Sequence, residues 1–176
     1  MNETVKLRKL AESDTANIVR WRNSPSVKCN LYSQEDITEE QHLNYFHNIV
    51  ETGKCAQYII VVEDENGSRD IGTTFIKNID RHSNKGEFGI FIGEESARGK
   101  GYAKYAISEI LRIAFDELNL HRVYLSVMAD NLLAIKSYKK VGFVIEGSFS
   151  DDYLRNDEYI DVIVMAIIKE NERGYV

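Results

Sequence analysis

Apolar and polar residues follow two different periods along this chain, and the periods separate expected strands from expected helices. Strands are expected where β-branched and apolar residues cluster, or where they alternate with polar ones so that successive side chains point to opposite faces. The alternation is clear in residues 87–92, where Phe88, Ile90 and Ile92 share one face. The expected strands are the region of Val5, Leu7 and Leu10 and residues 58–63, 71–79, 87–92, 123–127, 143–148 and 159–168.

The helical period is strongest after residue 106. Apolar side chains recur there three and four residues apart, which places them on one face of a helix. They are Ile107, Ile110, Leu111, Ala114, Phe115 and Leu118. Another helix is expected over residues 132–141, with Gly142 as its stop signal.

Capping signals predict two more helices near the N-terminus. Residues 13–14 are Ser and Asp, either of which can cap a helix over residues 15–22 that the Ser-Pro pair at 24–25 ends. Thr38 and Gln41 have the spacing of a capping box and open a helix that runs to about residue 50.

The order of these elements predicts the class of fold. Asn66-Gly67 is expected to turn a hairpin between two strands, and the polar residues 151–158 are expected to connect the last two strands. One strand, two helices, three strands and an α-β-α-β-β series follow one another. This order favours an α/β or α+β domain around a mixed sheet, and 176 residues suit a single domain over residues 1–176.

Composition excludes several classes of protein. Hydrophobic residues make up 43% of the chain and aromatic residues 10%, which argues against disorder. The net charge of −6 argues against a nucleic-acid partner, which needs a basic surface, but permits a cationic substrate. No apolar run approaches the ~20 residues that span a bilayer, so no membrane partner is expected.

The two cysteines and four histidines do not predict a metal site. Cys29 and Cys55 form no CxxC pair, and the histidines have no ligand spacing, so we interpret all six as surface or partly buried side chains. Residues 1–10 lack the apolar segment of a signal peptide. We expect a cytoplasmic protein with reduced cysteines.

A glycine-rich segment between an expected strand and the long helix has the properties of an anion site. The first N–H groups of a helix lack partners, the helix dipole makes that end positive, and glycines let a phosphate approach the backbone. The spacing fits neither a P-loop nor a dinucleotide fingerprint. A turn that merely starts a helix is the alternative. The segment is Arg98, Gly99, Lys100, Gly101, Tyr102 and Ala103.

Two blocks of residues resemble the GNAT superfamily of N-acetyltransferases. Arg98, Gly101 and Ala103 match the fixed positions of its acetyl-CoA signature, Arg/Gln-x-x-Gly-x-Gly/Ala. The second block resembles the branch that contains spermidine and ribosomal-protein alanine acetyltransferases. It consists of Asn131, Ala134, Tyr138, Gly142-Phe143, Glu146-Gly147, Tyr159, Asp161 and Met165.

The resemblance implies the GNAT fold, a mixed and mostly antiparallel sheet flanked by helices, with acetyl-CoA as co-substrate. It places the pyrophosphate of coenzyme A on the backbone of residues 98–104, which adds Lys104 to the segment above. The pantetheine arm is expected beside Ile90, Phe91 and Ile92, where residues 123–127 splay away. Asn131 is a further expected cofactor contact, although its side chain can equally cap the helix that follows.

Tyr138 and Glu87 are the candidate catalytic residues. The resemblance places Tyr138 near the sulfur as the acid that protonates the departing thiolate, and a phenol with a pKa of about 10 keeps its proton at neutral pH. Glu87 can take a proton from the attacking amine, whose own pKa is about 10. Tyr138 can equally be a core aromatic, and Glu87 a solvated strand residue. No nucleophilic triad is visible, so direct attack is expected, with a backbone N–H near Phe91 or Ile92 binding the oxyanion.

The acceptor is less clearly indicated than the cofactor. Residues 21–23 and 39–43 resemble acetyltransferases that act on nucleotide-linked amino sugars, which makes Trp21 and Arg22 candidate substrate contacts, although Trp21 can equally pack a helix on the sheet. We predict acetylation of a primary amine of a small metabolite, a polyamine or an amino sugar. A protein N-terminal acetyltransferase and a non-catalytic acetyl-CoA sensor are the alternatives, and a homo-oligomer is compatible with either.

Overall fold

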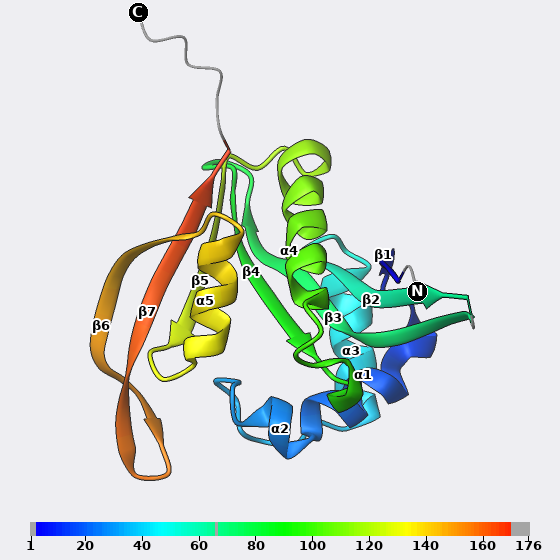
Figure 1. Cartoon of the computed structure of the whole chain (residues 1–176), viewed down its shortest axis with the longest axis horizontal. Helices are drawn as coiled ribbons and strands as arrows, with labels where there is room; N and C mark the ends of the chain where they lie inside the picture. The colour runs from blue at the N-terminus through cyan, green and yellow to red at the C-terminus, as the bar shows by residue number, and fades with distance from the viewer. Residues whose placement is uncertain (1–2, 66, 170–176) are drawn as a thin grey trace, which may run out of the picture.

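One mixed sheet organises the molecule (Figure 1), and the computed structural model describes residues 3–65 and 67–169 of it. In these residues seven strands lie in the order β1-β2-β3-β4-β5-β7-β6. All neighbours are antiparallel except β4 and β5, which confirms the predicted mixed, mostly antiparallel sheet. The strands are β1 (Thr4–Lys9), β2 (Ala56–Asp64), β3 (Gly67–Asp80), β4 (Lys85–Ile92), β5 (Arg122–Met128), β6 (Val144–Arg155) and β7 (Glu158–Ile168).

Helices cover both faces of the sheet (Figure 1). Apolar side chains are buried between the helices and the sheet. On one face, Trp21 and Phe46 pack with Ile59 of β2. On the other face, Ile107 and Ile110 pack with residues of β3, β5 and α5. Short π-helical turns at residues 46–50 and 113–117 extend α3 and α4. The helices are α1 (Thr15–Asn23), α2 (Pro25–Lys28), α3 (Glu39–Tyr45), α4 (Tyr102–Arg112) and α5 (Leu132–Lys140).

The N-terminal helices begin and end near the predicted residues, with two differences. Thr38 and Gln41 form the predicted capping box, since each side chain bonds the other's backbone. Asp14 does not cap α1, because its carboxylate accepts bonds from Arg8 and from the Ala11 backbone instead. Pro25 ends α1 but also starts α2, since the fixed φ of proline suits the first position of a helix.

Strands β4 and β5 separate along their length, and this separation creates the site. They pair only from Lys85↔Arg122 to Glu87↔Tyr124. Beyond these pairs, β4 continues to Ile92 against β3 alone. Its far edge therefore offers backbone groups that no described strand pairs with, the kind of edge on which an extended ligand can form strand-like bonds.

The last two strands are longer than predicted. Residues 151–158, expected to be a connection, belong mostly to β6 and β7, which turn only around Asn156 and Asp157. The apolar alternation fails here because this end of the hairpin is exposed on both faces. Its tip is held against the chain between α2 and α3, where Arg155 donates to the Cys29 carbonyl and Tyr153 bonds the Tyr32 carbonyl. Asn66, predicted in the β2–β3 turn, lies outside the described residues.

Candidate active site

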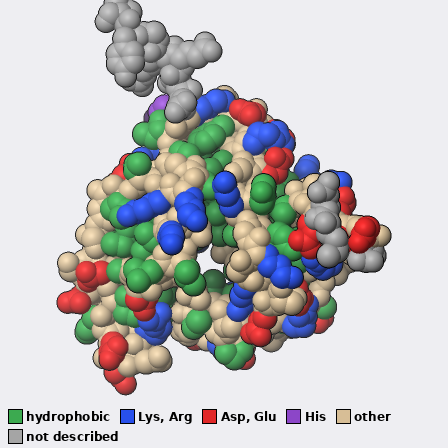
Figure 2. All heavy atoms as spheres, in the orientation of Figure 1, with side chains coloured by type: hydrophobic (Ala, Val, Ile, Leu, Met, Phe, Trp, Pro, Cys, Tyr) green, Lys and Arg blue, Asp and Glu red, His purple; other side chains and the backbone are tan. Residues whose placement is uncertain are grey.

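A cleft of about 920 Å³ lies where β4 and β5 separate. Figure 2 shows a hollow in this part of the molecule, with Lys and Arg side chains around it. Side chains from both faces of the sheet line the cleft. One end is formed by β4, β5, α5 and the turn before α4, and the other by α1, α2, α3 and β3. We call these the α4–α5 end and the α1–α3 end.

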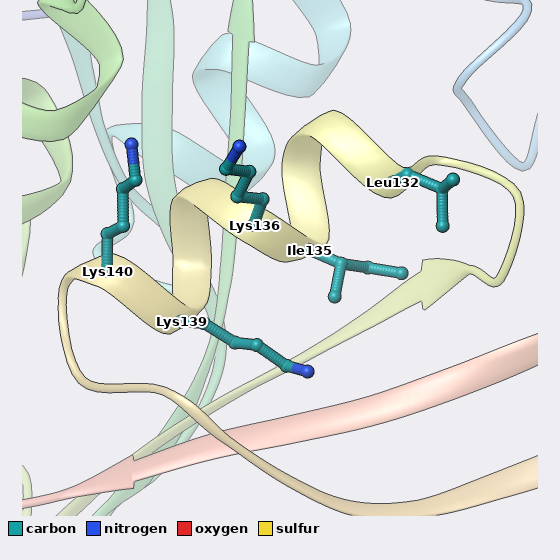
Figure 3. A pocket seen from close by; sticks show the side chains of 5 residues that line it. All are labelled: Leu132, Ile135, Lys136, Lys139 and Lys140. Carbon is teal, nitrogen blue, oxygen red and sulfur yellow. The ribbon is translucent and has the colours of Figure 1, made fainter.

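A second hollow, of about 530 Å³, lies on the outside of α5 (Figure 3). One helix supplies its whole lining, which is Leu132, Ile135, Lys136, Lys139 and Lys140. In the close-up, Lys136 and Lys140 point one way and Lys139 another, so the ammonium groups do not converge on one point. The residues that line this hollow include no carboxylate, hydroxyl or thiol, and the larger cleft is the candidate active site.

The turn before α4 has the backbone that the anion-site prediction requires. Gly99 and Gly101 have φ of +74° and +85°, and an added Cβ at either glycine would meet no atom within 4 Å. Both glycines line the cleft, and α4 begins directly afterwards at Tyr102. The open space beside these glycines and the unpaired first N–H groups of α4 fit a phosphate group.

The side chains of this turn are placed differently from one another. Arg98 lines the cleft, but its guanidinium donates to the Ile92 carbonyl at 3.0 and 3.1 Å and so closes the turn onto β4. Tyr102 lines the cleft too, but it is buried and its hydroxyl donates to Glu3, which lies outside the lining. Ala103 also lines the cleft, whereas Lys100 and Lys104 are exposed outside its lining. The turn therefore presents mainly backbone to a ligand.

The remaining predicted cofactor contacts also meet at this cleft. Ile90, Phe91 and Ile92 of β4 line it beyond the point where β5 departs. Asn131 lines it as well, while its side-chain oxygen accepts a bond from the Ala134 backbone at 3.2 Å. The structure thus shows the capping role that the sequence left open for Asn131, in a position that also borders the cleft.

Tyr138 lies on α5 at the inner wall of the cleft. Its ring packs against Phe88 of β4 and Phe143, with centroids 5.7 and 5.9 Å away. No group of residues 3–65 and 67–169 hydrogen-bonds its hydroxyl. Burial raises the pKa of Tyr138 to about 12. The hydroxyl therefore keeps its proton throughout the neutral range and can act as a donor.

Glu87 lines the cleft from the last residue of β4 that pairs with β5. Its carboxylate accepts a bond from the Asn78 side chain at 2.8 Å and forms an ion pair with Lys77 at 3.1 Å. Glu87 is the one acidic side chain in the lining contributed by the described residues. It can accept a proton there, but it shares its charge with Lys77.

The two predicted substrate contacts separate in the structure. Arg22 lines the cleft at its α1–α3 end and donates to the Glu35 carbonyl at 3.1 Å. Trp21 is buried outside the lining, packs over Gly93 and donates its indole N–H to Glu94 at 2.7 Å. Trp21 therefore has the packing role that the sequence left open.

Several lining residues were absent from the sequence prediction because they come from distant segments. Tyr32 lines the cleft and packs edge-to-face on Tyr153, with ring centroids 5.3 Å apart. His42 and Gln57 are buried side chains of the α1–α3 end. No local signal in the sequence marks either residue as part of a site, and only the fold shows that both line the same cleft.

Comparisons with known proteins agree with this geometry. Residues 4–144 match the family model described as acetyltransferase (GNAT) domain. A spermidine N(1)-acetyltransferase from Vibrio cholerae is 31% identical over 173 residues, 96% of this chain and 95% of that protein. The crystal structure of Vibrio cholerae spermidine N-acetyltransferase with CoA and spermine is 27% identical, has a TM-score of 0.85 and covers 93% of this chain and 95% of that one. A dodecameric structure of that enzyme has 27% identity, a TM-score of 0.77 and covers 93% of each chain.

The chain therefore belongs to the GNAT family of acetyltransferases. It is an acetyl-CoA-dependent N-acetyltransferase, and the open glycine turn beside the unpaired edge of β4 fits that co-substrate. Within the described part of the chain, no group of three or more His, Cys, Asp or Glu side chains is arranged to hold a metal ion. None of the described helices has the length and apolar character needed to cross a membrane.

Proposed function

We propose that this protein acetylates a primary amine of a small metabolite, either a polyamine or an amino sugar, by direct attack of the amine. The observation that carries the proposal is the cleft where β4 and β5 separate. Its α4–α5 end has the open glycine turn and Tyr138, and its α1–α3 end has Glu87 and a set of polar side chains. Two molecules that enter from the two ends meet beside β4.

The α4–α5 end binds the co-substrate in this proposal. Acetyl-CoA supplies the thioester and hence the acetyl group. The N–H groups of the turn and the first residues of α4 bind its pyrophosphate, and the far edge of β4 aligns its extended arm. A backbone N–H near Phe91 or Ile92 donates to the acetyl oxygen as negative charge develops there. Asn131 borders the arm from the start of α5.

Proton transfers are assigned to Glu87 and Tyr138. Glu87 accepts the proton that the attacking amine must lose, directly or through a water. Tyr138 donates its hydroxyl proton to the departing sulfur and regains one from solvent. Its raised pKa supports a role as an acid that remains protonated. The presence of both groups in one cleft argues against a sensor without catalytic activity.

The relatives support a small amine as acceptor. The similar proteins from Vibrio cholerae carry spermidine in their names, and one structure contains spermine, which supports a polyamine. The amino-sugar alternative rests on the chemistry of the α1–α3 end. Among the described residues that line this end, Glu87 is acidic, and Arg22 and Lys77 are basic.

The proposal also covers the number of domains, the cellular location and the oligomeric state. We propose one domain, because the described strands form one sheet, and a cytoplasmic location, because Cys29 is exposed and free. A homo-oligomer is supported by the dodecameric relative and by the apolar surface of the edge hairpin. Exposed apolar side chains there are Val144, Ile145, Phe149, Leu154 and Tyr159.

Release of free thiol from acetyl-CoA tests the proposal. The protein is mixed with acetyl-CoA and, in turn, polyamines, amino sugars and peptides that begin with Ala or Ser. Thiol release with a small amine, together with an N-acetylated product of the expected mass, supports the proposal. Turnover of the peptides alone would show that the acceptor is a protein N-terminus.

A further inference from the structure

Two buried side chains at the α1–α3 end each have one polar atom without a partner. His42 and Gln57 are 4% and 7% exposed. Among the described residues, no group bonds His42 Nε2 or Gln57 Oε1, and the nearby Ser26 Oγ is in the same state. Buried polar atoms are nearly always hydrogen-bonded, because an unpaired one costs free energy.

The other end of each side chain is already fixed. His42 Nδ1 lies 3.0 Å from the Thr15 hydroxyl, and Gln57 Nε2 donates to the Thr73 hydroxyl at 3.1 Å. Each side chain is therefore held in one orientation while its remaining polar atom stays available. Burial also lowers the pKa of His42, so the ring is neutral at neutral pH.

Both side chains line the same end of the cleft. In β2, Gln57 alternates with Tyr58 and shares the face of Ile59, which packs against α1 and α3. His42 projects from α3, and Ser26 belongs to α2. All three residues border the cleft. A ligand group that enters this end from the cleft can thus supply the missing partners.

The charges at this end fit an acceptor without additional positive charges. Lys77 already pairs with Glu87, the one acidic residue in the described lining, and Arg22 adds a second cation. A polyamine retains at least one more ammonium group besides the amine that reacts, and a buried charge needs an opposite one. Hydroxyl groups need only neutral donors and acceptors, as His42 and Gln57 provide.

We propose that His42 and Gln57 form a specificity-determining subsite that binds hydroxyl groups of the acceptor. The acceptor is then a hydroxylated amine of the amino-sugar class, which this subsite distinguishes from a polyamine. Ser26 adds a third hydrogen-bonding group. The inference rests on the proposed function and selects between its two substrate classes.

Acceptor selectivity is the first test. Values of kcat/KM are measured for spermidine, putrescine and spermine and for glucosamine, galactosamine and UDP-glucosamine. We expect the best hydroxylated amine to exceed every polyamine at least tenfold. A polyamine as the best acceptor, or no turnover of any hydroxylated amine, overturns the inference. Coenzyme A binding is measured separately by calorimetry, because its loss would instead contradict the proposed function.

A pair of His42 variants tests the subsite itself. The side chain of Asn reproduces the position of Nδ1 and omits that of Nε2, whereas Gln reproduces the position of Nε2. His42→Asn should raise KM for the best amino sugar about 3- to 10-fold, the effect of one neutral hydrogen bond. His42→Gln should raise it less, and both should leave KM for acetyl-CoA unchanged.

The same KM measurements provide a control variant and the results that would contradict the subsite. His82 is exposed outside the lining, so His82→Asn should have no effect. If His42 only supports the fold through Thr15, His42→Gln is the more harmful variant, because it loses that bond. Unchanged acceptor KM in a folded His42→Asn protein would likewise overturn the subsite, since a structural water would then satisfy Nε2.

Discussion

The two ends of the cleft are built from different parts of the chain. At the α4–α5 end, the lining residues of β4, the glycine turn and the first turn of α4 come from one short segment, residues 90–103, and β5 and α5 supply the rest. At the α1–α3 end, side chains from α1, α2, α3, β2 and β3 converge. Backbone recognition suits a constant co-substrate, whereas side-chain recognition is easily changed from one acceptor to another.

The difference extends to the polar groups. Arg98 and Tyr102 direct their side chains into the protein and leave the backbone of the turn accessible. His42 and Gln57 instead border the cleft, and each has one buried side-chain atom without a partner among the described residues. Changes at the first end should therefore affect acetyl-CoA or chemistry, and changes at the second should affect the acceptor.

The largest effect is expected at Tyr138, which separates chemistry from binding at the α4–α5 end. Tyr138→Phe keeps the ring contacts with Phe88 and Phe143 and removes only the hydroxyl. The turnover number should fall by ~10–1000-fold, near the lower part of the range for general acid catalysis, because a thiolate can leave unassisted. KM for acetyl-CoA should hardly change. Steady-state kinetics test this.

The exposed Tyr105 of α4 provides the matched control. Tyr105→Phe removes a hydroxyl from the same type of residue outside the cleft, and turnover should stay at the unmodified level. Unmodified turnover in Tyr138→Phe itself would assign the hydroxyl a structural part only, and water would then be the acid.

The next effect concerns the glycine turn and tests whether backbone recognition dominates at that end. Gly101→Val places a branched side chain where the amide must approach a phosphate, so KM for acetyl-CoA should rise by ~10–100-fold, the loss of one or two charge-assisted hydrogen bonds. Because φ is +85° at Gly101, part of any effect is backbone strain. Gly53→Val controls for strain, since Gly53 has φ of +74° with open space around it and lies outside the cleft lining.

Calorimetry with coenzyme A gives the deciding measurement for the turn. Gly53→Val should lose stability and keep its affinity for coenzyme A, whereas Gly101→Val should lose both. Equal affinity in the two variants would mean that the turn merely starts α4.

This contrast between the two ends explains what the sequence could predict. The predicted cofactor contacts lie within short segments, so periodicity, glycine spacing and the resemblance pointed to β4, the turn and α5 together. The acceptor contacts depend on tertiary structure. Nothing local to Gln57 or Ser126 distinguishes a lining residue from a core or surface one, and Tyr32 reaches the cleft because the distant Tyr153 holds its loop.

The wrong predictions about the fold have similar causes. Residues 151–155 were expected to be a loop because the hydrophobic pattern is absent where β6 leaves the core. Asp14 has the right residue type for a cap, but the nearby Arg8 and Ala11 backbone provide its bonds instead. A local pattern predicts an element well only where the element packs on the core or where no tertiary partner competes.

A smaller effect is expected at Glu87, the acidic residue of the α1–α3 end. Glu87→Gln should move the rising limb of the pH–rate profile to higher pH, because more of the free amine must come from solution. Near pH 7 we expect about a tenfold loss, below the usual contribution of a general base because Lys77 and Asn78 also use the carboxylate. At a pH above the pKa of the amine, the loss should disappear.

Lys77→Met distinguishes proton acceptance by Glu87 from its ion pair with Lys77. It removes the ion pair and leaves Glu87 present, so the pH–rate profile should keep its shape. A profile in Glu87→Gln that is parallel to the unmodified one at every pH would show that Glu87 orients groups rather than accepting a proton.

The smallest effect concerns stability, and it contrasts two histidines on successive turns near the α1–α3 end. Burial lowers the pKa of His42, and a bond to Glu51 raises the pKa of the exposed His47. His42 therefore contributes stability above pH 6.5, the usual pKa of an unfolded histidine, and loses it as pH falls, with a slope of at most about 1.4 kcal/mol per pH unit. The pH dependence of the His47 contribution has the opposite sign. His47 contributes stability at low pH, and this contribution is lost as pH rises through its raised pKa. In urea unfolding between pH 5 and 8, His42→Asn should flatten the loss of stability that occurs as pH falls below 6.5. His47→Asn should flatten the loss that occurs as pH rises above 6.5. If the slope of His42→Asn equals that of the unmodified protein, folding leaves the pKa of His42 unchanged, and burial does not enforce the neutral ring on which the acceptor subsite relies.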